Sequence, residues 1–333
     1  MLKIWRPIQI ARTMARKRRG QLVHGWVNVD KPLHLTSAAA VCIVRRAFDA
    51  QKAGHCGTLD PLATGVLPIA LGEATKTVPF VMHGSKGYRF KVQWGEARTT
   101  DDREGAVTET SAHRPARSEI VRMIPRFVGE INQVPPRFSA VKIGGRRAYE
   151  LARSRKEVDI KPRRVIVHAL RLVDIVGPDE AVFAVDCGKG TYIRSLARDL
   201  AASLGTVGHI SCLRRTYCGP FRDCDAIPLE KLARSCHMNS LQYRGSDGVP
   251  IDLAACLLPV ARALDDIPAL IVTKSEAGRI RNGQAIPVLR TDNRQQTKDF
   301  PNHANLCALL DGQVIALMRL EGRMAQPMRV LNL

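Results

Sequence analysis

The segment KGYRFKVQW at residues 86–94 constrains the fold more than any other part of the chain. Large apolar or aromatic residues alternate in it with polar ones: Tyr88, Phe90, Val92 and Trp94 with Arg89, Lys91 and Gln93. Successive side chains of a strand point to opposite faces of a sheet, so this period of two predicts a strand in a sheet with one buried face. We expect Tyr88 to point toward that buried face.

Other strands and helices are predicted on both sides of this segment. Further strands are expected at 25–32, 66–71, 163–176 and 181–187, and near the C-terminus at 312–320 and 329–333. Thr36 and Thr191 are each expected to cap a helix, and Arg194 would lie in the first turn of the second helix. Strand-rich and helix-rich pieces alternate without the regular βαβ rhythm of a doubly wound sheet. This favours an α+β fold, in which helices pack on a mixed sheet.

Basic residues outnumber acidic ones, with 51 Lys and Arg against 31 Asp and Glu and a formal net charge of +20. Such an excess points to a polyanionic partner. Residues 1–20 carry seven basic residues and no acid, which is typical of a flexible basic arm. The rest of the 333 residues, rich enough in apolar side chains for a sizeable core, is expected to form a large domain at 21–250 and a small unit at 257–333.

The sequence also bears on the compartment of the protein. No stretch reaches the roughly 18–20 apolar residues of a membrane span, and the N-terminus lacks the apolar block of a secretory signal. The arginine-rich start weakly resembles a mitochondrial transit peptide but contains no serine. The nine cysteines are an odd number without C-x-x-C spacing, which indicates reduced thiols and no metal site. We therefore expect a cytoplasmic protein.

A single carboxylate, Asp60, stands in the glycine-rich run GHCGTLDPLATGVLPIALGEATK at 54–76. The local sequence alone favours a helix cap, with Pro61 at the first helical position and the residues before 66 in a loop. A phosphate-binding loop is a second hypothesis, although the run lacks a G-K-[ST] ending. A metal site that uses His55, Cys56 and Asp60 is a third, although three unlike ligands within six residues match no common spacing.

Six motifs in order give a more specific indication. They are VDKPLHLTS, AGHCGTLDPLATGVLPIALGEATK, KGYRFKVQWG, PPRFSAVKIGGRRAYELAR, CGKGTYIRSLARDLAASLG and LRRT, within residues 22–222. Together they resemble the bacterial tRNA pseudouridine synthase B family, which isomerises the uridine at position 55 in the T loop of tRNA. The resemblance implies the family's catalytic domain at 21–250 and, at 257–333, a small β-rich PUA-like domain that binds RNA.

The resemblance also implies roles for individual residues. Asp60 corresponds to the catalytic aspartate, Tyr88 to the tyrosine that stacks on the target base, and Arg194 to the arginine paired with the aspartate. Four further residues fall where the family binds substrate: Lys31 and Leu213 in the pocket, His55 and Asp102 at the RNA. The reaction breaks the N-glycosidic bond and rejoins the uracil through C5, without a cofactor. The carboxylate serves either as a nucleophile or as a base on the ribose, and either role calls for an anion in a dry pocket.

Simpler roles remain open for most of these residues. By pattern alone Tyr88 and Leu213 fit a core, Lys31 fits a solvated turn, and Arg194 fits a helix start where a nearby anion would offset the helix dipole. His34 stands where the family usually has glycine, and Arg98 and Thr99 depart from its T-D-T-x-D pattern.

At the level of function, the alternative is a non-catalytic RNA-binding or tRNA-folding protein on the same fold. The expected partner is tRNA, contacted by the arm and by the basic stretches at 142–156 and 161–164. No membrane or protein partner is expected, and the protein would be a monomer.

Overall fold

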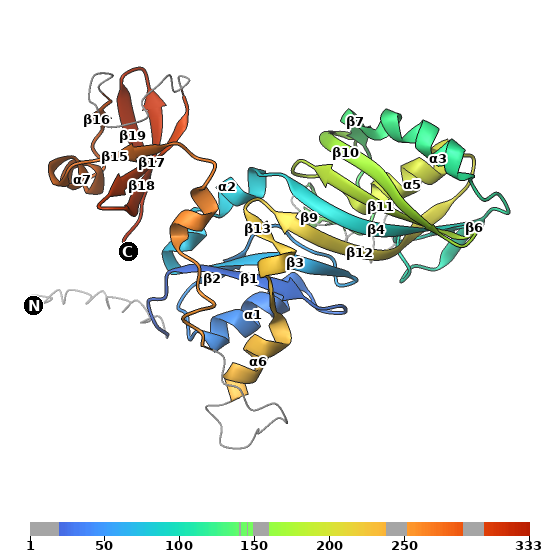
Figure 1. Cartoon of the computed structure of the whole chain (residues 1–333), viewed down its shortest axis with the longest axis horizontal. Coiled ribbons are helices and arrows are strands. Elements are labelled where there is room, and N and C mark those ends of the chain that lie inside the picture. Colours follow the sequence, from blue (N-terminus) through green and yellow to red (C-terminus); the bar gives the residue numbers. More distant parts are fainter. Residues whose placement is uncertain (1–19, 140, 145, 149–159, 238–251, 289–302) are drawn as a thin grey trace, which may run out of the picture.

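The computed structural model describes residues 20–139, 141–144, 146–148, 160–237, 252–288 and 303–333. Two sheets dominate it, one of ten strands and one of five, and they lie in different parts of an elongated molecule (Figure 1). The predicted arm at 1–20 falls outside the described residues, apart from Gly20. None of the described helices is long and apolar enough to cross a membrane.

The large sheet has the strand order β14-β1-β3-β12-β4-β11-β10-β7, with β2 paired to β3 and β13 to β12. β1 with β14 and β12 with β3 are parallel pairs and the other pairs are antiparallel, so the sheet is mixed, as predicted. Its strands are β1 Gly25–Lys31, β2 Ala53–His55, β3 Ala63–Leu71, β4 Lys86–Trp94, β7 Gly129–Gln133, β10 Arg163–Val176, β11 Glu180–Cys187, β12 Gly208–Cys218, β13 Phe221–Arg222 and β14 Ile227–Pro228. Two short hairpins lie outside it: β5 Glu96–Arg98 with β6 Val107–Thr110, and β8 Lys142–Ile143 with β9 Arg146–Arg147.

The alternating segment forms β4, between β12 and β11 near the middle of the large sheet. Tyr88, Phe90 and Trp94 are buried and Arg89 is exposed, which confirms the predicted faces. Phe90 stacks on Phe183 of β11, with ring centroids 5.4 Å apart. A period of two therefore locates the core side of the sheet correctly.

Helices pack on the large sheet, and two of them carry residues discussed below: α1 Ser37–Ala47 and α5 Ile193–Ser203. The others are α2 Val78–His83, α3 Arg117–Met123 and α6 Leu229–His237, with short 3-10 helices η1 Gly72–Lys76, η2 Ile124–Phe127 and η3 Asp223–Asp225. Thr36 caps α1 as predicted, since its hydroxyl accepts a hydrogen bond from Ala39 N at 3.1 Å.

The start of α5 differs from the prediction. Tyr192, not Thr191, is its N-cap, and the hydroxyl of Thr191 instead donates to the carbonyl of Gly188. The amide of Tyr192 is bound by the side chain of Gln133, 2.8 Å away. The first turn of α5 therefore has no side-chain cap, and Gln133 binds the residue that precedes it. Arg194 lies in the first turn of α5, as predicted.

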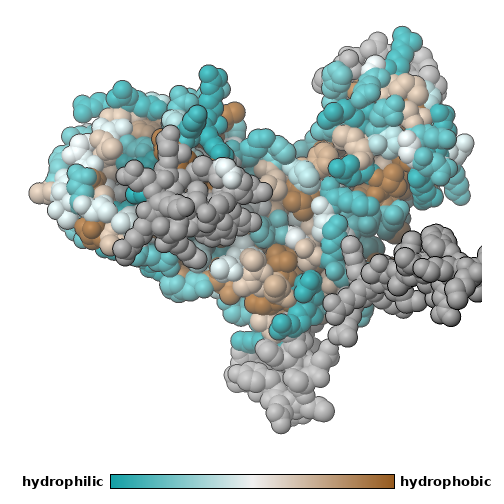
Figure 2. Space-filling model, turned by 180° about the vertical axis from the view of Figure 1, so that it is seen from behind, coloured by the Kyte–Doolittle hydropathy of each residue, from teal (hydrophilic) through white to brown (hydrophobic). Residues whose placement is uncertain are grey.

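The C-terminal residues form the second sheet, in the order β15-β17-β18-β19-β16. Its elements are η4 Val260–Leu264, β15 Ala269–Ile271, α7 Lys274–Arg281, β16 Ile286–Pro287, β17 Asn305–Leu310, β18 Gln313–Glu321 and β19 Met324–Val330. One apolar cluster contains residues of both parts, among them Trp26, Phe221, Leu264 and Leu317. Seen from behind, apolar residues also gather near the junction of the two parts (Figure 2). The structure shows eight cysteines as free thiols: Cys42, Cys56, Cys187, Cys212, Cys218, Cys224, Cys256 and Cys307.

Candidate active site

Asp60 lies in a turn that leads into a strand. The amide of Ala63, the first residue of β3, donates to the carbonyl of Asp60 at 3.0 Å. No helix follows, so the helix-cap hypothesis for Asp60 is wrong. The glycine-rich run also differs from the predicted loop, because β2 lies within it and β3 begins three residues earlier than expected.

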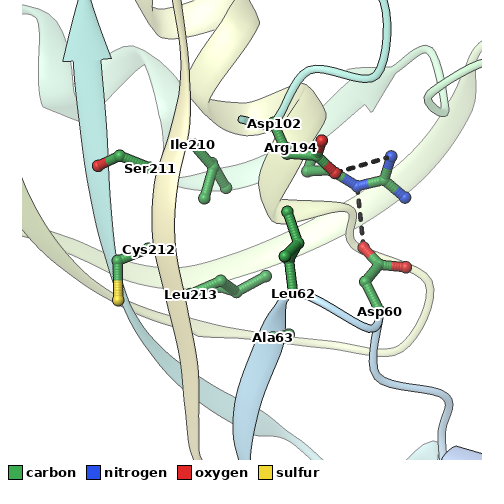
Figure 3. Close-up of a pocket in the computed structure, with 9 residues that line it drawn as sticks. All are labelled: Asp60, Leu62, Ala63, Asp102, Arg194, Ile210, Ser211, Cys212 and Leu213. Carbon is green, nitrogen blue, oxygen red and sulfur yellow. Dashed lines mark ion pairs between the residues drawn. The ribbon is translucent and has the colours of Figure 1, made fainter. Parts of the chain in front are cut away.

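The side chain of Arg194, in the first turn of α5, points toward Asp60 and forms an ion pair with it (Figure 3). Its Nε lies 2.9 Å from Asp60 Oδ2, a charge contact in which the N–H does not point along a hydrogen bond. The other two nitrogens donate to backbone carbonyls, Nη1 to Thr100 at 2.8 Å and Nη2 to Phe138 at 2.9 Å. The guanidinium is therefore fixed by the backbone of two loops. Asp60 supplies the anion that this cation at a helix start was expected to have nearby.

Arg194 is much more deeply buried than Asp60. The side chain of Arg194 is 6% exposed, whereas that of Asp60 is 40% exposed. The expected dry pocket around the carboxylate is thus absent from the free protein. Asp60 faces the solvent, and a bound substrate would have to exclude the water.

Lys31 holds the turn that contains Asp60 through hydrogen bonds to backbone carbonyls. It is fully buried, and its Nζ donates to the carbonyls of Leu35 at 2.7 Å, Pro32 at 2.8 Å and Pro61 at 3.3 Å. Burial lowers the pKa of Lys31 to about 8, against the opposing charge of Asp60. The hypothesis of a solvated turn residue is therefore wrong. The side chain of Lys31 also does not line either of the two cavities described below. It stabilises the turn at Asp60 and is not part of the pocket lining.

The turn has two further attachments, neither of which was predicted. The hydroxyl of Ser37 at the start of α1 binds both the amide and the carbonyl of Leu59, at 2.8 and 3.0 Å. Arg215 of β12 donates to the carbonyl of Gly57 at 3.1 Å and to that of Val66 at 2.7 Å. The backbone on both sides of Asp60 is therefore held by buried side chains.

Two open cavities meet at Asp60 and Arg194. One has a volume of about 300 Å³, and its lining includes Tyr88, Leu213, Lys86, Lys189, Tyr192 and Arg215. The other has a volume of about 610 Å³, and its lining includes Thr36, His55, Asp102, Phe138 and Ser139. Both volumes lie in the range of small-ligand pockets, roughly 300–1,000 Å³. The cleft is thus large enough for a small ligand.

Tyr88 and Leu213 come from adjacent strands, β4 and β12. Each is more than nine-tenths buried, belongs to the main apolar core and also lines the smaller cavity. The core hypothesis and the pocket hypothesis therefore describe the same side chains. Burial raises the pKa of Tyr88 to about 12, so its hydroxyl keeps its proton at neutral pH.

Asp102 and His55 line the larger cavity. Asp102 is 8% exposed and accepts hydrogen bonds from the hydroxyl of Thr100 at 2.5 Å and the amide of Glu104 at 3.1 Å. One of its oxygens also lies 3.9 Å from Arg194 Nη1. Burial lowers the pKa of His55, and its buried Nδ1 has no hydrogen-bond partner among the described residues.

The sequence analysis missed several cleft residues, among them Lys86, Ser139, Tyr192 and Arg215. Arg215 stands in the LRRT motif and Tyr192 two residues before Arg194, so both lay inside segments already singled out. Lys86 and Arg215 are buried, donate to backbone carbonyls and, within the described ranges, form no ion pair. They make the smaller cavity positive. Of the described His, Cys, Asp and Glu side chains, no three gather closely enough to hold a metal ion.

The mixed sheet thus carries a cleft in which a partly exposed carboxylate pairs with a buried guanidinium beside a cationic cavity, and this makes the cleft the candidate site of an enzyme. The model of the TruB family pseudouridylate synthase N-terminal domain matches residues 45–193, and that of the tRNA pseudouridylate synthase B C-terminal domain matches 194–265. This chain belongs to the TruB family of pseudouridylate synthases, which are isomerases.

Two relatives align with nearly the whole length of this chain. The tRNA pseudouridine synthase B of Bradyrhizobium diazoefficiens is 52% identical over 93% of this chain and 86% of its own length. That of Caulobacter sp. strain K31 is 47% identical over 96% of this chain and all of its own. A solved Cbf5-Nop10-Gar1 complex is similar with a TM-score of 0.68 and 25% identity, over 92% of this chain and 84% of that chain.

A second solved structure, an H/ACA RNP bound to a substrate RNA containing 2′-deoxyuridine, also has a TM-score of 0.68. At 21% identity over 98% of this chain and 94% of that chain, it supports the fold alone.

The boundary between the two family matches is not a boundary of the fold. It falls between Ile193 and Arg194, inside α5. The second match contains β12, which lies between β3 and β4 in the large sheet. The two matches thus form one structural unit, and the five-stranded sheet begins after residue 265, outside both.

Proposed function

We propose that this protein converts uridine 55 in the T loop of tRNA to pseudouridine, with Asp60 as the reacting carboxylate. The observation that carries the proposal is the ion pair of Asp60 and Arg194, 2.9 Å apart where the two cavities meet. An exposed carboxylate in a cationic cleft would weaken the binding of a polyanion, so its presence fits chemistry better than binding alone. The Bradyrhizobium and Caulobacter relatives are both named tRNA pseudouridine synthase B, and this supports tRNA as the substrate.

The target uridine has to leave its stack to reach Asp60, which costs a few kcal/mol. Contacts of the base with Tyr88 and Leu213, and of phosphates with Lys86 and Lys189, offset this cost. The nucleotide also covers Asp60 and displaces the water that now reaches it. His55 and Asp102, on the wall of the larger cavity, contact the RNA beside the target, while Lys31 holds the turn.

The reaction is an isomerisation that needs no cofactor. The bond from C1′ to N1 breaks, a bond from C1′ to C5 forms, and the proton lost from C5 is balanced by one gained at N1. Asp60 acts either as a nucleophile at the sugar or the base, or as the base that takes a proton from the ribose. Arg194 fixes the direction of the carboxylate in each case.

The remaining parts of the proposal concern the whole protein. We expect a cytoplasmic monomer that acts without a protein partner and contacts tRNA through the T arm. The C-terminal residues at 257–333 would form the PUA-like RNA-binding unit and hold the acceptor-stem side of the tRNA. The large domain at 21–250 would carry out the chemistry.

The test uses the purified protein and an unmodified tRNA transcript, with pseudouridine mapped by chemical probing. Wild-type protein should modify position 55 only, and a transcript with cytidine at that position should stay unmodified. Asp60→Asn should bind tRNA and form no pseudouridine, whereas Asp179→Asn, outside the cleft, should match the wild type. Tight binding without modification by the wild type would favour the tRNA-folding alternative, and modification elsewhere would overturn the assignment of position 55.

A further inference from the structure

A second arginine lies one helical turn after Arg194 on α5. Arg198 Nη1 is 3.0 Å from Asp101 Oδ2, and its Nη2 donates to the carbonyl of Val134 at 3.0 Å. Its Nε donates to Asp199 at 2.9 Å. Residues four apart lie on the same side of a helix, so Arg194 and Arg198 face the same part of the molecule.

The two arginines bind the same two loops. In the loop at 98–106, Arg194 binds the carbonyl of Thr100 and Arg198 binds the side chain of Asp101. In the loop at 134–139, Arg194 binds the carbonyl of Phe138 and Arg198 that of Val134. Both loops line the larger cavity. The hydroxyl of Ser195 also donates to the carbonyl of Val134, at 2.7 Å. Each loop is therefore attached to α5 through Arg194, which touches Asp60, and one turn later through Arg198, which does not.

The backbone at Asp101 shows how closely the first loop depends on this contact. Asp101 has φ +58°, a left-handed conformation that is costly for a residue with a Cβ atom. Its amide donates to the carbonyl of Arg98 at 3.0 Å, and its carbonyl accepts from the amide of Ile210 of β12 at 3.1 Å. The side chain is 15% exposed. Without Arg198, the mostly buried carboxylate of Asp101 would lose its ion-pair partner, and the loop would be free to relax.

We propose that the ion pair of Arg198 and Asp101 is a positioning pair for the reaction assigned above, on which this inference rests. It holds the carbonyl of Thr100 and the carboxylate of Asp102 against Arg194. Arg194 in turn holds the direction of Asp60. Neither Arg198 nor Asp101 lines the two cavities that meet at Asp60, so the pair acts on the chemical step and not on RNA binding.

The test compares Arg198→Gln and Asp101→Asn with the wild type in single-turnover reactions at saturating enzyme. Asparagine tolerates the left-handed backbone, so Asp101→Asn removes only the charge. Each variant should slow pseudouridine formation by about tenfold or more, because small displacements of reacting groups are costly. The Kd for tRNA should change by less than about twofold. Arg171→Gln, which breaks an ion pair with Asp186 away from the cleft, should leave both values unchanged.

Two further measurements separate positioning from a general loss of structure. The double variant Arg198→Gln/Asp101→Asn should be no slower than either single variant, and Arg198→Gln should have a smaller effect in an Arg194→Lys background. An unchanged rate, a loss confined to tRNA affinity, or effects that simply add would each overturn the proposal. Hydrogen exchange at 98–106 should increase in Arg198→Gln but not in Arg171→Gln. Hydrogen exchange tests the role of the ion pair independently of activity. If the wild type made no pseudouridine, that result would count against the proposed function and not against the role of the pair.

Discussion

Two buried cations near Asp60, Lys31 and Arg215, form no ion pair with any residue that the structure describes. Lys31 and Arg215 are at most 1% exposed, and they donate to backbone carbonyls of the residues around Asp60. Carbonyl oxygens satisfy the donors without cancelling the charge. The carboxylate of Asp60 therefore lies near several positive charges, and among the described residues its ion-pair partner is Arg194.

Lys31 gives a prediction about the dependence of stability on pH. Its pKa is about 8 in the folded protein, below the ordinary value of 10.5 that applies in the unfolded chain. Below pH 8 the proton is bound in both states, and the cost of burying the charge is present in full. Between about 8 and 10.5 the unfolded state binds more protons, so the free energy of unfolding rises with pH.

Urea unfolding of the wild type and Lys31→Met at pH 6.5 and 9.5 checks this. The stability of the wild type relative to the variant should increase at the higher pH, and the comparison cancels the titration of other groups. A difference that stays constant would mean that Lys31 titrates as it does in water.

His34 gives a second prediction at this scale. It is exposed and has φ +60° in the turn after β1, where glycine was noted as the usual residue of the family. The left-handed conformation costs a non-glycine residue roughly 1–2 kcal/mol, and the greater flexibility of an unfolded glycine offsets about half of this. His34→Gly should raise the free energy of unfolding by about 0.5–1 kcal/mol in urea titrations. A loss of stability would indicate a contact of the imidazole that matters more than the strain.

At the scale of elements, the cleft depends on β12. It runs parallel to β3 and antiparallel to β4, and so brings Leu213 next to Ala63 and Arg215 next to Tyr88. The close approach of β3 to β12 requires a glycine at position 65. A Cβ atom there would overlap the backbone carbonyl of Arg215, and its φ of +99° disfavours other residues.

Gly65→Ala should therefore be far more destabilising than Gly177→Ala. Gly177 also has a positive φ, +69°, but a Cβ there would meet no atom within 4 Å. The control should lose about 1 kcal/mol from backbone strain alone, and Gly65→Ala about 3 kcal/mol or more from strain and overlap together. Denaturant unfolding of both variants gives the difference. Equal losses would show that β3 and β12 can move apart without cost.

At the scale of the whole molecule, each of the two sheets has an apolar core of its own, and a further cluster is shared between them. Leu317 of β18 lies in the cluster that includes Trp26 of β1, whereas Leu306 of β17 lies in a cluster formed by C-terminal residues only. Polar contacts join the parts as well: Lys76 donates to the carbonyl of Val330 at 2.8 Å, and Glu73 accepts from the amide of Asn332 at 2.7 Å. The C-terminal sheet is thus attached to the large sheet by a packed interface.

This arrangement predicts different consequences for two equally buried leucines. Leu317→Ala and Leu306→Ala should each cost about 2–5 kcal/mol locally. Only Leu317→Ala should also increase hydrogen exchange in β1, because only Leu317 packs in the cluster that contains Trp26. Increased exchange in β1 for both variants would mean that the two cores unfold as one.

The sequence by itself determined what depends on local periodicity and chemistry. Alternation defined the faces of β4 because the two sides of a strand are set by the backbone, and Thr36 identified the start of α1 because a cap is made by neighbouring residues. The ordered motifs indicated the family, which the family models and relatives confirm. The roles assigned to Asp60, Tyr88 and Arg194 remain predictions for the experiments above.

Tertiary structure alone decided the features that depend on partners distant in the chain. An Asp-Pro pair can begin a helix or a turn, and it forms a turn here because the next residues pair with β1 and β12. A lysine before a proline looks solvated until a loop thirty residues away covers it. Arg198 and Asp101 lie 97 residues apart, so no local pattern links them. Burial and charge pairing arise from which segments meet, and that is fixed only when the sheet assembles.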